Sequence, residues 1–144
     1  IMILCLAGGH VSFTRATGTT AGIPELMDGG VRRRFRIGHG PNSTHSVPCA
    51  PLGTALAALG MAHVDLLSLD VQGAELLVLN TLRWREMSIG VLLSECKRLG
   101  CTDPQDTQVS KLVVANGLVH VGILRARHDV WDSVFVNRSL LARD

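Results

Sequence analysis

The feature that most constrains the fold is a strongly apolar run that ends among acidic residues. Residues 63–75 read His-Val-Asp-Leu-Leu-Ser-Leu-Asp-Val-Gln-Gly-Ala-Glu. The apolar run ends at Asp70, and an apolar-striped segment begins at Ala74. This pattern is typical of a buried strand followed by a helix. Open α/β sheets bind ligands at the carboxyl ends of their strands, so Asp70 is the first candidate for a functional residue.

From residue 51 onward, strand and helix patterns alternate. Apolar runs predict strands at residues 64–69, 89–93, 118–124 and 131–136. Helical spacing predicts helices at 51–59, at 74–84, and from a cap at Thr102 or Asp103 to an end at Asn116. The strand at 64–69 is apolar enough to be covered on both faces. The last two strands have no helix between them and should pair antiparallel. We therefore expect an α/β fold with right-handed crossovers.

The first third of the chain is divided by glycines into short segments. Extended segments are predicted at residues 10–15, 31–37 and 43–49. Residues 32–36 carry four arginines around Phe35. In a strand, Arg32, Arg34 and Arg36 share one face. That face is either a solvated cationic surface or a landing patch for an anionic substrate.

Composition limits the class of protein and of partner. The chain has 144 residues, of which 47% are hydrophobic and 18% charged, as expected for one globular domain. Its formal net charge of +2 gives no argument for a nucleic-acid partner. Apolar runs are interrupted well before the roughly 18 residues that a membrane span needs. We expect neither nucleic-acid binding nor a membrane span.

Cysteines and histidines show no metal-binding spacing. The four cysteines form no CxxC pair and are expected as buried free thiols, with a loop disulfide between Cys96 and Cys101 as the alternative. The six histidines form no HExxH, and no phosphate loop or GxSxG elbow is present. His45, in a polar loop, is the best histidine candidate for a catalytic or substrate contact.

Carboxylates gather where the predicted strands end. Asp70 and Glu95 follow consecutive strands, so they should share one rim of the sheet. There they could bind a ribose or amine, act as a base, or hold a metal. Glu75 lies in the first helical turn, where a structural role at the helix dipole is equally open. Gly73 lets the chain turn tightly or a ligand approach the backbone. Asp65 should lie at the opposite rim.

Residues 64–75 closely resemble the signature of FkbM-type S-adenosylmethionine-dependent methyltransferases. The family usually reads "idfLslDvEGaE" there, followed by a helix of "l.vL" type that residues 76–79 match. Looser similarity covers other family segments, at residues 9–14, 47–59, 89–95 and 132–136. The resemblance spans residues 9–138 and is specific in the block 64–79.

This resemblance implies a fold and an activity. The fold would be a Rossmann-like class I methyltransferase sheet, mostly parallel, with an antiparallel C-terminal hairpin. S-adenosylmethionine would be the cofactor, near Asp70, Gly73 and Glu75. Asp70 and Glu95, with His45 as the further candidate, would act on the acceptor. The expected reaction is O-methylation of a small-molecule or sugar hydroxyl.

Two departures from the family pattern bear on activity. Gln72 stands where the family usually has Glu, which removes one charge and one possible base. The family's first strands and glycine-rich cofactor loop would precede residue 1, so we expect residues 1–144 to be a single, incomplete domain that is inactive alone. The alternative is a non-catalytic, methyltransferase-like interaction or trafficking module. An unrelated nucleotide-binding domain is a third interpretation.

Overall fold

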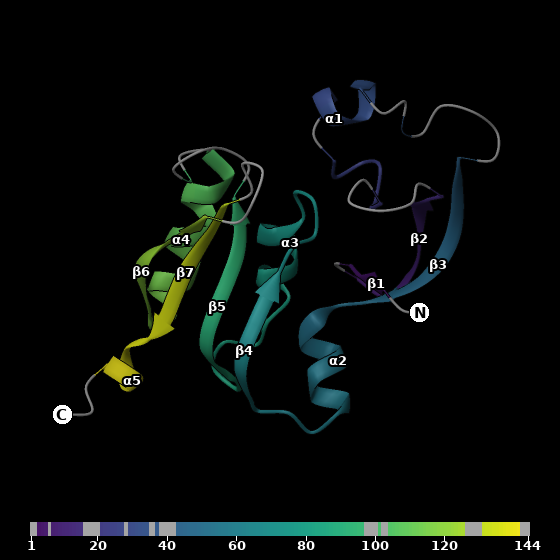
Figure 1. Ribbon diagram of the computed structural model, residues 1–144. Helices are drawn as coiled ribbons and strands as arrows, with labels where there is room; N and C mark the ends of the chain where they lie inside the picture. The colour runs from purple at the N-terminus through teal and green to yellow at the C-terminus, as the bar shows by residue number, and fades with distance from the viewer. Residues whose placement is uncertain are drawn as a thin grey trace.

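The computed structural model describes residues 3–5, 7–15, 21–27, 29–34, 37, 43–96, 101, 104–125 and 131–141. Two sheets and five helices make up this part of the chain (Figure 1). The three-stranded sheet contains β1 (Ile3–Leu4), β2 (Gly9–Thr14) and β3 (Thr44–Ala50). The four-stranded sheet contains β4 (His63–Leu69), β5 (Ser88–Cys96), β6 (Leu118–Arg125) and β7 (Trp131–Asn137). The helices are α1 (Gly29–Arg34), α2 (Leu52–Ala58), α3 (Glu75–Asn80), α4 (Pro104–Ala115) and α5 (Arg138–Leu141).

The four-stranded sheet is mixed, with the order β4-β5-β7-β6. Only β4 and β5 pair in parallel, whereas β7 pairs antiparallel with both β5 and β6. The prediction of a mostly parallel Rossmann-like class I methyltransferase sheet is therefore wrong. The physical reason is twofold. The last strand inserts between β5 and β6, and the first three strands form a small sheet of their own. The predicted antiparallel pairing of the last two strands is confirmed.

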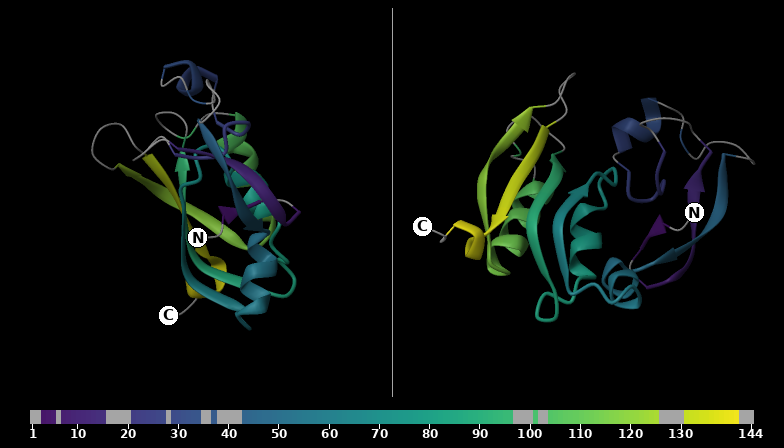
Figure 2. Two further views of the ribbon diagram at one scale, coloured as in Figure 1. Left: turned by 90° about the vertical axis from the view of Figure 1, so that its right-hand side faces the viewer. Right: turned by 60° about the horizontal axis from the view of Figure 1, so that its bottom comes forward.

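The hydrophobic core lies between the four-stranded sheet and the helices α3 and α4, which lie on one face of it (Figure 2). Helical spacing puts the apolar stripe of α4, including Val109 and Val113, against the sheet. The side chains that are almost fully buried come from both layers: Leu79, Ile89, Leu92, Val113, Leu118 and Phe135. Among the described residues, no helix is long and apolar enough to cross a membrane, as expected.

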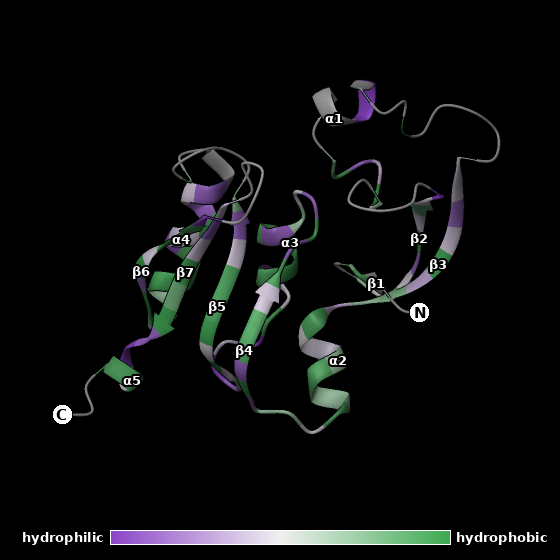
Figure 3. Ribbon diagram, in the orientation of Figure 1, coloured by the Kyte–Doolittle hydropathy of each residue, from purple (hydrophilic) through white to green (hydrophobic). Residues whose placement is uncertain are grey.

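Apolar residues run along β4, β5 and β7 (Figure 3), and some apolar side chains of the sheet are exposed. Leu66 on β4 is 58% exposed, so the prediction that this strand is covered on both faces is wrong. The reason is that α3 and α4 both lie on one face of the sheet, so the described elements leave Leu66 exposed on the other face. Exposed apolar side chains continue on β6, where Val121 and Leu124 are 50% and 52% exposed.

The start of helix α2 packs closely against the residues that follow α3. It begins after Pro51 and is followed by Gly60, whose φ of 69° ends the helix as predicted. The Leu52 amide donates to Thr81 Oγ1 at 3.1 Å. A side chain at Gly53 would collide with the Thr81 carbonyl oxygen, so glycine permits this close approach.

One predicted strand is a helix. Residues 29–34 form α1, and the Ile37 amide donates to the Arg32 carbonyl at 2.9 Å. The extended segment predicted at 31–37, with its alternating arginine face, is therefore wrong; Arg36 lies outside the described residues. Arginine is among the residues with the highest helix propensity, and no strand pairs with residues 29–34 within the described part of the chain.

All four cysteines form disulfides, Cys5 with Cys49 and Cys96 with Cys101. The prediction of free thiols is wrong, and the alternative pairing of Cys96 with Cys101 is confirmed. The other bond follows from tertiary pairing. Strand β1 lies parallel to β3, with Ile3 opposite Cys49, which brings the Cα atoms of Cys5 and Cys49 to 5.6 Å.

The core predicts a large stability contrast between two leucines. Leu79 is fully buried, so Leu79→Ala should lower the free energy of unfolding by roughly 2–5 kcal/mol. Leu59 is 73% exposed, and Leu59→Ala should lower the free energy of unfolding by no more than about 0.5 kcal/mol. Urea denaturation measures both. Similar losses for the two variants would contradict this packing.

Candidate functional site

The strand register brings three carboxylates to one rim of the four-stranded sheet. Leu69 lies opposite Ser94 in the parallel pair, so the next residues, Asp70 and Glu95, leave the two strands side by side. Antiparallel β7 then places Asp132 opposite Glu95. We call Asp70, Glu95 and Asp132 the acidic rim. The expected proximity of Asp70 and Glu95 is thus found.

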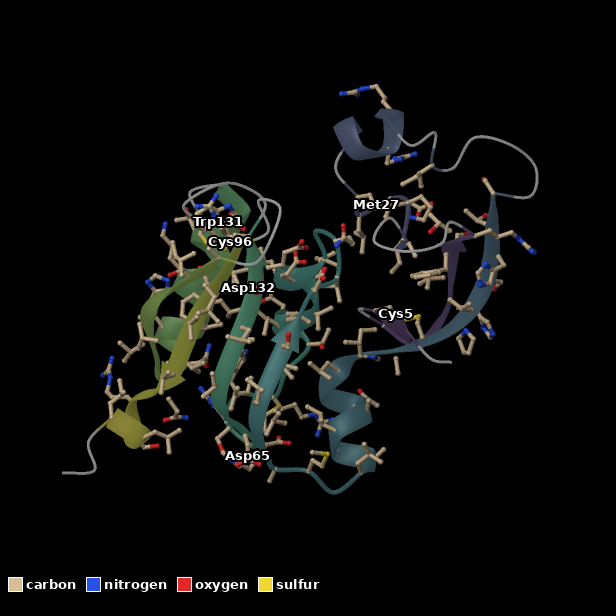
Figure 4. The ribbon with its side chains drawn as sticks, viewed as in Figure 1. Cys5, Met27, Asp65, Cys96, Trp131 and Asp132 are labelled. Carbon is tan, nitrogen blue, oxygen red and sulfur yellow. A yellow bond between two sulfur atoms is a disulfide. The ribbon has the colours of Figure 1, made fainter. Side chains whose placement is uncertain are left out.

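Figure 4 shows the two ends of this sheet. Asp132 lies at the end where β4 and β5 finish, and Asp65 lies at the other end of β4, as predicted. The sequence assigned Asp132 no functional role, because its position depends on the insertion of β7 beside β5. The one indication in the sequence was that Asp132 lies at the start of the last predicted strand.

The turn after β4 has an unusual backbone conformation that Glu75 stabilises. Gln72 and Gly73 have φ angles of 54° and 101°, in the left-handed region. For Gln72 this costs roughly 1–2 kcal/mol. Glu75 is only 3% exposed, and its Oε1 accepts the amide hydrogens of Val71 at 3.1 Å and Gly73 at 3.2 Å. The Glu75 carboxylate therefore holds the turn together.

Gln72 connects two members of the acidic rim. Its side-chain Nε2 donates to Asp70 Oδ1 at 2.7 Å and to Glu95 Oε2 at 3.3 Å. A glutamate at this position would add a further negative charge and would lose both donors. The amide is therefore suited to hold Asp70 and Glu95 close together.

Burial and neighbouring negative charges raise the pKa values of two acids of the rim, Glu95 and Asp132. Burial raises the pKa of Glu95 from 4.5 to about 8, helped by a hydrogen bond to Asp70 and by the charges of Asp70, Glu75 and Asp132. Burial and then the Asp70 charge also raise the pKa of Asp132. Near neutral pH, Glu95 therefore keeps its proton and can donate it in a hydrogen bond to Asp70.

The structure does not bring His45 to the acidic rim. His45 lies on β3, where its exposed ring meets Phe13 edge to face with 6.1 Å between centroids. Its sheet is separate from β4–β7, and α2 and α3 lie between the two sheets in Figures 1 and 2. The catalytic role predicted for His45 remains a prediction without a structural partner at the rim.

The arrangement narrows the possible chemistry. Within the described ranges, no group of His, Cys, Asp or Glu side chains is arranged to hold a metal ion. The rim instead combines an exposed carboxylate, Asp70, with a protonated carboxyl, Glu95, and an amide donor, Gln72. Such a set binds polar or cationic groups and moves protons.

Comparisons with known proteins found no match: no protein-family model, no curated protein and no solved structure is similar enough to indicate a relationship. The resemblance of residues 64–79 to FkbM-type methyltransferases therefore has no independent support from these comparisons. It enters the functional interpretation as a proposal.

The turn geometry predicts that Glu75 contributes to stability. Glu75→Ala leaves the amides of Val71 and Gly73 without their acceptor and should lower the free energy of unfolding by roughly 1–3 kcal/mol. Glu75→Gln keeps a side-chain acceptor and should lose less. Urea denaturation measures both variants, and an equal loss would contradict the role of these hydrogen bonds.

The raised pKa of Glu95 predicts a pH-dependent stability. Between pH 4.5 and about 8, the folded protein keeps a proton on Glu95 that the unfolded chain releases. The Glu95 contribution to the free energy of unfolding is therefore present at low pH and falls as the pH rises through this window. Glu95→Gln removes this titration.

The measurement is the difference in unfolding free energy between wild type and Glu95→Gln across the same pH range. The wild type should lose stability relative to the variant as the pH rises. A difference that stays constant from pH 4.5 to 8 would exclude the raised pKa.

Proposed function

We propose that this chain contributes the acceptor side of an S-adenosylmethionine-dependent methyltransferase site that O-methylates a small-molecule or sugar hydroxyl. The proposal rests on one observation above others, the adjacent carboxyl groups of Asp70 and Glu95 at the ends of β4 and β5, which the Gln72 amide bridges. The resemblance of residues 64–79 to the family signature gives this pair its suggested reaction.

A hydroxyl acceptor must lose its proton as its oxygen becomes a nucleophile. Asp70 is exposed and is oriented by the Gln72 amide, which leaves carboxylate lone pairs for the hydroxyl hydrogen. Glu95, with a pKa of about 8, is a stronger base than an ordinary carboxylate once it is ionised. The pair can therefore accept the hydroxyl proton once Glu95 ionises, near pH 8.

Part of the predicted cofactor set fits S-adenosylmethionine. This cofactor supplies an electrophilic methyl group on a cationic sulfonium, and the exposed Asp70 carboxylate suits its positive charges. Gly73 has no side chain to prevent a close approach to the backbone. Glu75 fits poorly, because it is buried and its Oε1 already accepts two backbone amides.

The test uses the whole protein, titrated with S-adenosylmethionine in a calorimeter and assayed for methyl transfer to sugar and small-molecule hydroxyls. Binding is expected, and Asp70→Asn should lower methyl transfer by about 10²–10⁴-fold. Asp65→Asn is the matched control, because Asp65 lies at the opposite end of β4.

A second readout is the pH dependence of methyl transfer. The rate should rise as Glu95 ionises near pH 8, and Glu95→Gln should remove that rise. Absence of cofactor binding, or an Asp70→Asn variant that behaves like wild type, would overturn the proposal. Those results would favour the non-catalytic interaction module instead.

A further inference from the structure

A cavity of about 300 Å³ lies between the three-stranded sheet and α3, away from the acidic rim. Its walls come from β1 and β2, from the segment at residues 23–26 and from α3. The apolar side chains that line it include Leu4, Val11, Ile23, Leu26, Leu77 and Val78. None of Asp70, Glu95 or Asp132 lines this space.

The walls are held by covalent and packing constraints. The disulfide between Cys5 and Cys49, both of which line the cavity, joins the end of β1 to β3; Figure 4 labels Cys5 there. On the opposite wall, Ala74 and Val78 are buried in the core, only 4% and 2% exposed. The cavity therefore exists before any ligand enters, as is usual for small-molecule sites.

The chemistry of the lining selects one class of ligand. An apolar cavity holds water poorly and gains contacts when an apolar group fills it. Its titratable lining residues are Glu25 and His10, both exposed and hence at the opening. Among the described residues, no lysine or arginine lines the cavity, and none forms an ion pair with Glu25.

We infer that this cavity binds a small molecule with an apolar body and a cationic group, such as an alkylamine. The apolar body fills the space between β2 and α3, and the ammonium lies beside Glu25 at the opening. The carboxylate attracts the ammonium, and the partly open position keeps both groups hydrated enough to avoid a large desolvation cost. This site is independent of the proposed methyl transfer.

The test compares three probes of equal chain length on the whole chain by calorimetry: octylamine, octanol and octanoate. Octylamine should bind with one molecule per chain, at least about fivefold more tightly than octanol, and octanoate should bind most weakly. Glu25→Gln should make octylamine and octanol bind alike. Glu86→Gln, which removes an exposed acid remote from this cavity, is the matched charge control.

Filling the cavity gives the second test. Leu77→Trp should weaken octylamine binding by at least about tenfold, because the indole occupies the ligand space. Val11→Phe narrows the same space from β2. It serves as the second cavity-filling variant if circular dichroism shows that Leu77→Trp is unfolded. Leu66→Lys, on the open face of the four-stranded sheet, should leave binding unchanged.

Four results would overturn the inference. Three are no octylamine binding, full binding in a folded cavity-filled variant, and octanoate binding as tightly as octylamine. The fourth is loss of binding in Leu66→Lys, which would place the probe on the exposed sheet face instead. Each result is separate from S-adenosylmethionine binding, so failure here leaves the proposed function unaffected.

Discussion

The parallel register of β4 with β5 is the constraint on which the acidic rim depends. It places Leu69 beside Ser94, so the two chains leave the sheet with Asp70 and Glu95 adjacent. The antiparallel insertion of β7 then adds Asp132 opposite Glu95. Shifting β4 by one residue would turn Asp70 away and expose Leu69, which is 3% exposed here. Burial of the core therefore secures the geometry of the rim.

Three acids at one rim repel one another, and the structure offsets this repulsion in two ways. Gln72 donates to both Asp70 and Glu95, and Glu95 keeps its proton up to about pH 8. Glu75 has a different role. Its carboxylate accepts two backbone hydrogen bonds in the left-handed turn and so stabilises the turn that positions Gln72. The same short segment thus contains two acids with different roles: Glu75 stabilises the turn, and Asp70 lies beside Glu95 at the rim.

Local patterns allowed much of the fold to be predicted. The runs that became β4 and β5 are apolar, and Gly60 and Gly117 end helices with positive φ, which is a local property. The adjacency of Asp70 and Glu95 also followed from consecutive parallel strands.

Features set by tertiary pairing could not be predicted in the same way. The arginine-rich segment forms α1 and pairs with no strand in the described part of the chain, and Cys5 meets Cys49 because β1 lies beside β3. The fold class was wrong because the position of β7 beside β5 has no signature within its own residues. The role of Glu75 could not be predicted either. An acidic residue in the first turn of a helix looks the same in sequence whether it binds a ligand or stabilises a turn.

The most direct test of the proton held by Glu95 is a carbon-13 NMR titration of the Glu95 carboxyl. The account predicts a midpoint near pH 8, and a shift of that midpoint toward 4.5, without reaching it, in Asp70→Asn. The remaining elevation reflects burial, which is the largest cause of the raised pKa. A wild-type midpoint near 4.5 would contradict the account, because Glu95 would then be ionised beside Asp70 at neutral pH.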